Sequence, residues 1–182
     1  MKNFFSKIKK QVLLSVLFVC SLCIVSCDDA TTKVNKKSQS NKAESLIKIN
    51  KEIVKNENEE INAYVKRHNW TMKETGTGLR YMNYVKGSGE KAKTGQTAKV
   101  NFKISLLDGT ICYSSEKTGA EEFFIGEDHV ESGLHEGVQL MCVGDKTIFI
   151  LPPHLAHGLI GDKDKIPPLS TIVYDIELVG LK

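Results

Sequence analysis

The segment near the C-terminus, residues 133–181, constrains the fold more than any other part of the chain. It begins with G-L-H-E-G-V-Q-L-M-C-V-G, continues as an apolar run that ends at Pro152-Pro153, and closes after Pro167-Pro168 with the alternating run T-I-V-Y-D-I-E-L. All four prolines of the chain lie in these two pairs, so the turns that flank the last two predicted strands are stiff. The pattern predicts one short helix resting on an antiparallel sheet, with an ordered loop before the last strand.

Further alternating or apolar runs predict the rest of the sheet. Asp108-Gly109 lies between two such runs and is typical of a tight hairpin turn. The short helix is expected over residues 133–143, with Gly144 as its left-handed C-cap. The expected strands cover residues 79–85, 97–107, 110–115, 146–151 and 171–181, and a polar loop from Glu116 leads to the apolar residues 123–125.

Residues 1–26 have the pattern of a secretory signal peptide. Four lysines precede an uncharged apolar run over residues 12–25, which is short for a membrane span. The Ser26-Cys27 pair resembles the end of a bacterial lipobox, in which Cys27 is lipidated and becomes the first mature residue. Acyl chains on Cys27 would make the membrane a partner and place the protein at the cell envelope, on the periplasmic face or the cell surface. An uncleaved N-terminal anchor, or a signal cut elsewhere with Cys27 incidental, is the alternative.

Removal of residues 1–26 changes what charge and cysteine content imply. The segment contains four lysines and no acidic residue, so the formal charge falls from +3 to −1 and nothing indicates nucleic-acid binding. Cys112 and Cys142 are the two cysteines after Cys27. We expect them to be small buried hydrophobes, although a disulfide in an oxidising compartment stays open.

Two segments precede the expected domain at residues 71–182. Residues 27–42 are polar and predict a flexible tether. Residues 43–70 predict an N-terminal helix, which is either a dimerisation or partner-binding element over residues 43–68 or a helix that packs on its own domain or stays solvated. Its apolar stripe consists of Leu46, Ile49, Ile53, Ile61, Tyr64 and Val65.

Several separated blocks, in the right order, resemble the FK506-binding-protein (FKBP) class of peptidyl-prolyl isomerases. The resemblance spans about residues 79–181 and implies an α+β fold, with an antiparallel sheet wrapped on one short helix and preceded here by the N-terminal helical extension. Together with the lipobox and the tether, it is also similar to the gliding-motility-associated FKBP lipoproteins of the Bacteroidetes group. The matching blocks are G-Q-T (95–97), L-L-D-G-T (106–110), S-S-E-K-T-G (114–119), E-G-V-Q-L-M-x-V-G (136–144) and I-P-P (166–168).

The resemblance implies cis/trans isomerisation of X-Pro bonds in exported proteins, with proline-containing polypeptides as clients and no cofactor or metal. Conjugation stiffens the amide C–N bond and opposes rotation. A twisted amide is less polar than a planar one, so an apolar, water-poor pocket favours the twisted state. This chemistry requires no nucleophile, and the chain shows no Ser/His/Asp constellation. His154 and His157 are spaced as a metal pair could be, but histidines near prolines more often lie in a surface loop.

The pocket positions of the family can be placed on this sequence. His157 stands where the family has a tyrosine that donates to the substrate carbonyl, and Leu134 forms the floor. Glu131 is expected to contribute mainly its backbone N–H. The expected catalytic residues are Phe102, Tyr113, Phe123, His157 and Tyr174. The expected substrate-binding residues are Cys112, Val130, Glu131, Leu134 and Ile166.

This chain departs from the family pattern at several pocket positions. Cys112 and Tyr113 replace an aromatic–acid pair, and Tyr113 either fills the space beside Cys112 or occludes the pocket. Glu121 occupies a ring position by strict spacing, with Phe123 as the nearest ring. We therefore expect lower turnover and weak affinity for the family's macrolide inhibitors.

Two other functions stay open beside catalysis. The altered positions favour a non-catalytic binding or chaperone module on the same scaffold, and a scaffold does not determine function. Alternatively, the chain is a structural subunit of an envelope assembly, such as a gliding-motility machine, and docks through the N-terminal helix.

Overall fold

The computed structural model describes residues 29–182, so the predicted signal peptide and Cys27 lie outside the described residues. Among residues 29–182, no helix combines the length and the apolar character needed to cross a membrane. The chain divides after Lys51 into two units, and residues 52–182 form a compact unit that contains the whole sheet. The other, N-terminal unit ends at Lys51, within the first helix that the structure describes.

This first helix, α2 (Asp29–Arg67), is longer than predicted. It begins at Asp29, where the sequence predicted a tether up to residue 42, and residues 29–42 contain no glycine or proline that would interrupt a helix. It ends at Arg67 because Asn69 adopts a left-handed conformation, with φ of 54°, and Trp70 N–H donates to the carbonyl of Val65.

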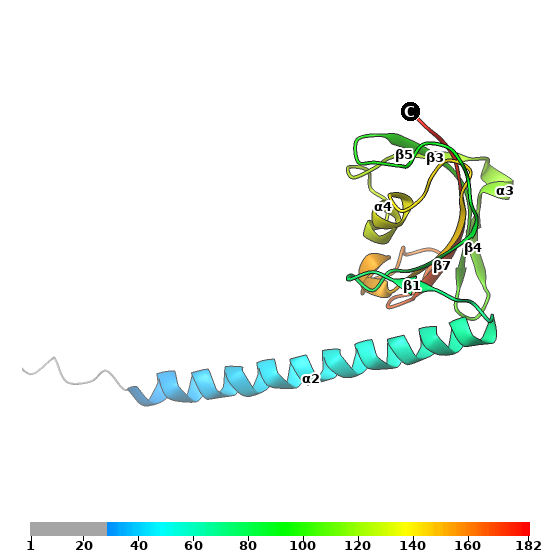
Figure 1. Cartoon of the computed structure of the whole chain (residues 1–182). Helices are drawn as coiled ribbons and strands as arrows, with labels where there is room; N and C mark the ends of the chain where they lie inside the picture. The colour runs from blue at the N-terminus through cyan, green and yellow to red at the C-terminus, as the bar shows by residue number, and fades with distance from the viewer. Residues whose placement is uncertain (1–28) are drawn as a thin grey trace, which may run out of the picture. The chain divides into compact units, whose positions relative to one another are not determined.

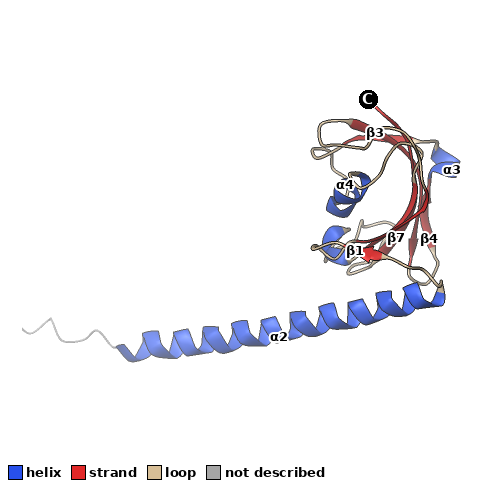
Figure 2. Cartoon of the chain, viewed as in Figure 1, coloured by secondary structure: helices blue, strands red, loops and turns tan. Residues whose placement is uncertain are grey.

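The compact unit is a curved antiparallel sheet with short helices, which confirms the predicted fold class (Figure 2). The strand order is β1-β2-β6-β7-β3-β4, and β5 pairs with the first half of β3 while β4 pairs with its second half. The short helices are α3 (Ser115–Thr118), α4 (Ser132–Val138) and the 3₁₀ helix η1 (Pro153–Leu155). The strands are β1 (Lys73–Glu74), β2 (Arg80–Val85), β3 (Thr97–Leu106), β4 (Ile111–Ser114), β5 (Glu121–Phe124), β6 (Lys146–Leu151) and β7 (Ile172–Leu181).

Helix α4 lies within the curve of the sheet (Figure 1). A Cβ atom on Gly137 would lie 2.9 Å from the ring of Phe149, so glycine allows the helix to rest directly on β6. The helix ends at Val138, five residues earlier than predicted. Gly144 does have a positive φ of 91°, but it belongs to the turn before β6, not to the helix C-cap.

Strand β6 is buried on both faces. Phe149 and Leu151 belong to the main core with α4, whereas Ile148 and Ile150 contact a second cluster that includes Ile61 of α2. With both faces covered, the strand has a continuous apolar sequence instead of an alternating one. The C-terminal part of α2 thus packs on its own domain, as one of the two sequence interpretations proposed.

Candidate active site

A cavity of about 740 Å³ is bordered by β3, β4, β5, β7 and the start of α4. This volume is in the range of small-molecule and peptide pockets. Nine of the ten pocket positions expected from the sequence line it: Phe102, Cys112, Tyr113, Phe123, Val130, Glu131, Leu134, His157 and Tyr174. Ile166 does not line the cavity, because its side chain is buried in the core behind it.

The inner wall of the cavity is apolar and aromatic. Leu134 of α4 and Tyr174 of β7 are 5% and 4% exposed, and the ring centroids of Tyr174 and Phe102 are 6.2 Å apart. Phe123 of β5 is also buried and meets the ring of His135 edge-on at 5.8 Å. Such a wall excludes water from a bound apolar group, including a proline ring.

The carboxylate of Glu131 lies within this apolar wall. Glu131 directly precedes α4, and its side chain is only 9% exposed. Its Oε1 atom lies 2.9 Å from His157 Nε2, and its Oε2 atom accepts a hydrogen bond of 2.9 Å from the Tyr174 hydroxyl. Because a carboxylate only accepts, the Nε2 atom of His157 is the donor. The prediction that Glu131 contributes mainly its backbone was therefore incomplete.

The Tyr174 hydroxyl stays protonated in this arrangement. Burial raises its pKa well above the usual value, and the nearby charges of Glu131 and Glu121 raise it further. Both side-chain donors of the inner wall, the Tyr174 hydroxyl and His157 Nε2, are bound to Glu131.

A second tyrosine–carboxylate contact lies at the edge of the cavity. The Tyr113 hydroxyl donates to Asp162 Oδ2 at 2.5 Å and lies 3.2 Å from Asp164 Oδ2. Asp162 Oδ1 in turn accepts the backbone N–H groups of Asp164 and Ile166, which shapes the loop. Tyr113 therefore links β4 to the loop before β7, and the cavity beside it stays open. Of the two roles considered for Tyr113, the structure disfavours occlusion.

The hydrogen bond from Tyr113 changes the charge behaviour of both partners. Burial alone would raise the pKa of Asp162, but the Tyr113 hydroxyl and the backbone N–H groups of Asp164 and Ile166 outweigh it and lower the pKa to about 2. The Tyr113 hydroxyl has a raised pKa, chiefly because it donates to Asp162. A permanent negative charge consequently lies at this edge of the cavity.

Comparison with known proteins identifies the scaffold. The family model of the FKBP-type peptidyl-prolyl cis-trans isomerases matches residues 88–179. The chain belongs to this family. It is 41% identical over 92 residues to FK506-binding protein 2 of Dictyostelium discoideum, covering 50% of this chain and 69% of that protein. It is also 37% identical over 111 residues to the isomerase FkpA of Escherichia coli, covering 61% of this chain and 40% of that protein.

Solved FKBP structures show the same fold. The crystal structure of FkpA from Escherichia coli matches with a TM-score of 0.62 and 29% identity, over 96% of this chain and 82% of that one. That of AtFKBP13 matches with a TM-score of 0.60 and 30% identity, over 62% of this chain and all of the other. The chain spans only 16% of the length of other relatives, the bovine and human isomerases FKBP10.

The FKBP domain has free thiols at both of its described cysteines, Cys112 and Cys142. Cys112 is buried, and its Sγ atom faces the carbonyls of Thr110 and Lys165 at 3.8 and 3.7 Å. Burial, then the charges of Asp162 and Asp108, raise the pKa of the Cys112 thiol. A protonated thiol is a poor nucleophile, so Cys112 acts as a small apolar wall residue.

Two polar elements of this FKBP pocket were missed by the sequence analysis: the Glu131 side chain and Asp162. The D-K-D-K run at residues 162–165 has the composition of a turn, which was its only signal. The Glu131–His157 and Tyr113–Asp162 contacts each join residues more than 25 positions apart, so no local sequence pattern predicts them.

Proposed function

We propose that this protein catalyses cis/trans isomerisation of X-Pro bonds in exported polypeptides. Membership of the FKBP family supports the reaction class. The observation that carries the proposal is the cavity wall formed by the buried Leu134 and Tyr174 and the partly buried Phe102, which offers an apolar surface to a prolyl ring.

The mechanism follows from the polarity of the amide. A planar X-Pro amide is strongly polar and well hydrated, and twisting it breaks the conjugation and reduces that polarity. Water excluded from the wall cannot stabilise the planar form, so the wall lowers the free energy of the twisted state relative to it. Uncatalysed isomerisation takes tens of seconds, which is slow enough to limit folding.

Hydrogen bonds would fix the substrate against the wall. Among residues 29–182, no acceptor is bound to the backbone N–H of Glu131, which is available to a substrate carbonyl. In our proposal the Nε2–H of His157 serves the same purpose when it leaves Glu131 for the substrate carbonyl, because Nδ1 of the neutral ring carries no proton to donate.

Exchange NMR of purified protein with short X-Pro peptides tests the reaction. We expect a rate enhancement that falls when His157 or Tyr174 is replaced by alanine. His154→Ala is the control, because His154 binds the carbonyl of Thr77 and does not line the cavity. No enhancement for any residue before proline would disprove catalysis.

A binding or chaperone module is the second candidate. Glu131 engages both side-chain donors of the wall, and Cys112 and Glu121 stand where the family usually has rings. Peptide binding to the cavity without any exchange enhancement would support this candidate over the enzyme.

We also propose that lipidated Cys27 anchors the protein at the cell envelope, where it serves exported clients, including those of a gliding-motility assembly. The support is the sequence of residues 1–27. Incorporation of labelled fatty acid, and membrane fractionation of wild type and Cys27→Ser, test the anchor. A variant that stays acylated and membrane-bound would refute it.

A partner or second copy is proposed to dock on the exposed apolar residues of α2. Residues Leu46, Ile47, Ile49, Ile53 and Val54 are exposed, whereas Ile61 and Tyr64 are buried. Sedimentation of wild type and of Ile47→Lys/Ile49→Lys would show whether these residues hold a dimer. If both sediment as monomers, cross-linking to a partner protein is the remaining test.

A further inference from the structure

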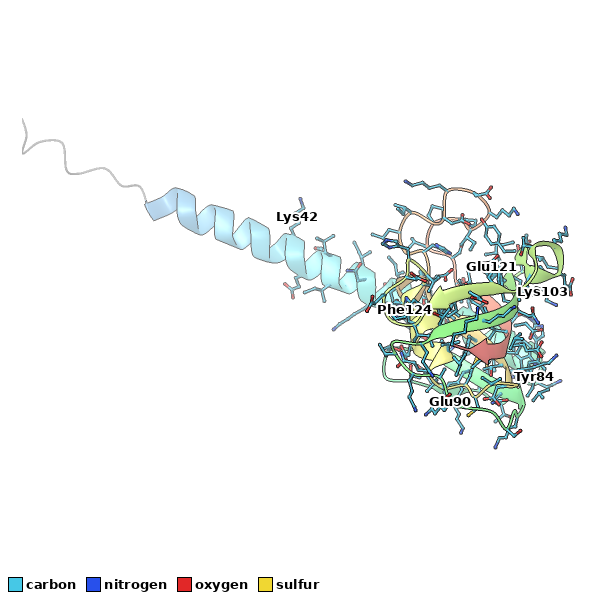
Figure 3. The ribbon with its side chains drawn as sticks, turned by 90° about the horizontal axis from the view of Figure 1, so that it is seen from above. Lys42, Tyr84, Glu90, Lys103, Glu121 and Phe124 are labelled. Carbon is cyan, nitrogen blue, oxygen red and sulfur yellow. The ribbon has the colours of Figure 1, made fainter. Side chains whose placement is uncertain are left out.

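Charged side chains border the cavity, and their interactions differ. Glu121 and Glu122 are adjacent on β5, whose two ends are labelled in Figure 3 at Glu121 and Phe124. Glu122 Oε2 lies 2.8 Å from Lys182 Nζ and Oε1 lies 4.0 Å from Lys99 Nζ. The hydrogen bond from Lys182 lowers the pKa of Glu122. Glu122 is therefore paired with lysines of its own chain.

Glu121 has no such cation. Its Oε1 atom accepts a hydrogen bond of 3.3 Å from the Thr118 hydroxyl, and among residues 44–182 no Lys, Arg or His lies within ion-pair distance. Thr118 is neutral, so Glu121 is an exposed acidic residue at the cavity surface that has no cation as a partner among residues 44–182. Glu121, which strict spacing placed at a ring position, lines the cavity.

Three lysines also border the cavity, and none of them forms an ion pair with Glu121. Lys165 Nζ lies 4.6 Å from the ring centroid of Tyr113, and Lys103 and Lys117 are exposed. At the buried Tyr174, burial and the charges of Glu131 and Glu121 raise the pKa, and no lysine opposes them. At Cys112, burial, Asp162 and Asp108 raise the pKa, and Lys165 is the one cation that opposes them. Acidic side chains therefore lie near both of these wall residues.

We propose that the cavity selects X-Pro segments with a lysine or arginine beside the proline, and that Glu121 is the residue that determines this preference. The inference rests on the proposed isomerase function. A guanidinium or ammonium group of the substrate would pair with the Glu121 carboxylate while the prolyl ring lies against the apolar wall. The negative charge of Asp162 at another edge adds to the attraction for a cation.

The preference is measured with matched peptides by exchange NMR. One series varies the residue before proline and another the residue after it, each with Leu, Lys, Arg and Glu, at low and high salt. We expect kcat/KM for a Lys or Arg peptide to exceed that of the Leu peptide about three- to tenfold at one of the two positions, and that of the Glu peptide by more. The advantage should shrink at high salt, because ions screen the pair.

Two variants distinguish a specific effect of Glu121 from an effect of the net charge of the protein. Glu121→Gln should reduce the Lys/Leu ratio of kcat/KM towards one. Glu127→Gln changes the net charge equally at an exposed residue that does not line the cavity, and should keep the ratio. A ratio near one in the wild type, or an equal change in both variants, would overturn the proposal.

The outcomes also separate this proposal from the proposed function. If Leu peptides are isomerised without a basic preference, the selectivity proposal fails and the isomerase stands. If no peptide is isomerised but Lys peptides bind more tightly than Leu peptides, and Glu121→Gln removes the difference, the isomerase fails and the selectivity holds for binding. Absence of both exchange and binding refutes both.

Discussion

The cavity contains two tyrosine–carboxylate contacts with the same chemistry and different surroundings. Tyr174 donates to Glu131 at 2.9 Å within the buried wall, and Tyr113 donates to Asp162 at 2.5 Å at the cavity edge. The shorter contact is the more exposed one, so water can replace it when it is broken. A buried partner left without its hydrogen bond keeps the full desolvation cost. Distance alone therefore misjudges which contact matters more for stability.

Replacing each tyrosine by alanine should give the largest difference in stability between the two contacts. We expect Tyr174→Ala to reduce the free energy of unfolding by about 3–5 kcal/mol, because a buried ring is lost and a cavity remains. Tyr113→Ala should cost much less, since its ring is only half-buried. Urea denaturation of both variants measures this, and equal losses would contradict the ranking.

Removing only the hydroxyl isolates the hydrogen bond. Tyr174→Phe should cost about 1–3 kcal/mol, because Glu131 Oε2 loses its donor inside the wall. Tyr113→Phe should change stability less, because Asp162 keeps its backbone donors and solvent. The same denaturation experiment applies. A larger loss for Tyr113→Phe would mean that the edge contact is more protected from water than the structure indicates.

Replacing each carboxylate by its amide compares how much the two contacts contribute to activity. Glu131→Gln should lower kcat/KM for a Leu-Pro peptide about three- to tenfold, because an amide cannot accept from His157 and Tyr174 as a carboxylate does. Asp162→Asn should have a smaller effect, since it acts only on the loop. Exchange NMR measures both. If Asp162→Asn is the more harmful, the loop and not the inner wall controls the pocket.

Acid titration should give the smallest of these effects on stability. The pKa of Asp162 is lowered from 3.8 to about 2 on folding, so its contribution to stability is present above pH 3.8 and is lost as the pH falls towards 2. Tyr113→Phe removes one cause of the lowered pKa and should reduce the loss of stability over this window. Thermal melts from pH 5 to pH 2 measure it. Parallel curves for wild type and variant would show that the Tyr113 contact does not lower this pKa.

Most strands could be predicted because each has a local signal. The run K-T-I-F-I-L predicted β6 to the residue, and Asp108-Gly109 does form the turn between β3 and β4, with Gly109 at φ of 89°. Helix boundaries were less predictable. The start of α2 lacks an apolar period. At the end of α4, the backbone N–H groups of Leu140 and Met141 donate to the carbonyls of Gly137 and Val138, three residues back, so the chain leaves the α-helical pattern there.

The pocket could be predicted through the family pattern, but its polar contacts could not. Cys112, Leu134 and Tyr174, which the spacing of the family motifs placed in the pocket, line the cavity. Glu131 and Asp162 bind partners that only the folded chain brings near.

The sequence by itself determined the fold class and the position of the short helix against the sheet, and its resemblance to the family located nine residues that line the cavity. The fold class and the helix position depend on periodicity, on turn residues and on Gly133 and Gly137, which permit close helix–strand contact. Tertiary structure alone decided that Glu131 binds His157 and Tyr174, and that Tyr113 holds the loop through Asp162. The physical reason is that a hydrogen bond depends on distances of a few ångströms between distant residues, which local sequence patterns do not encode.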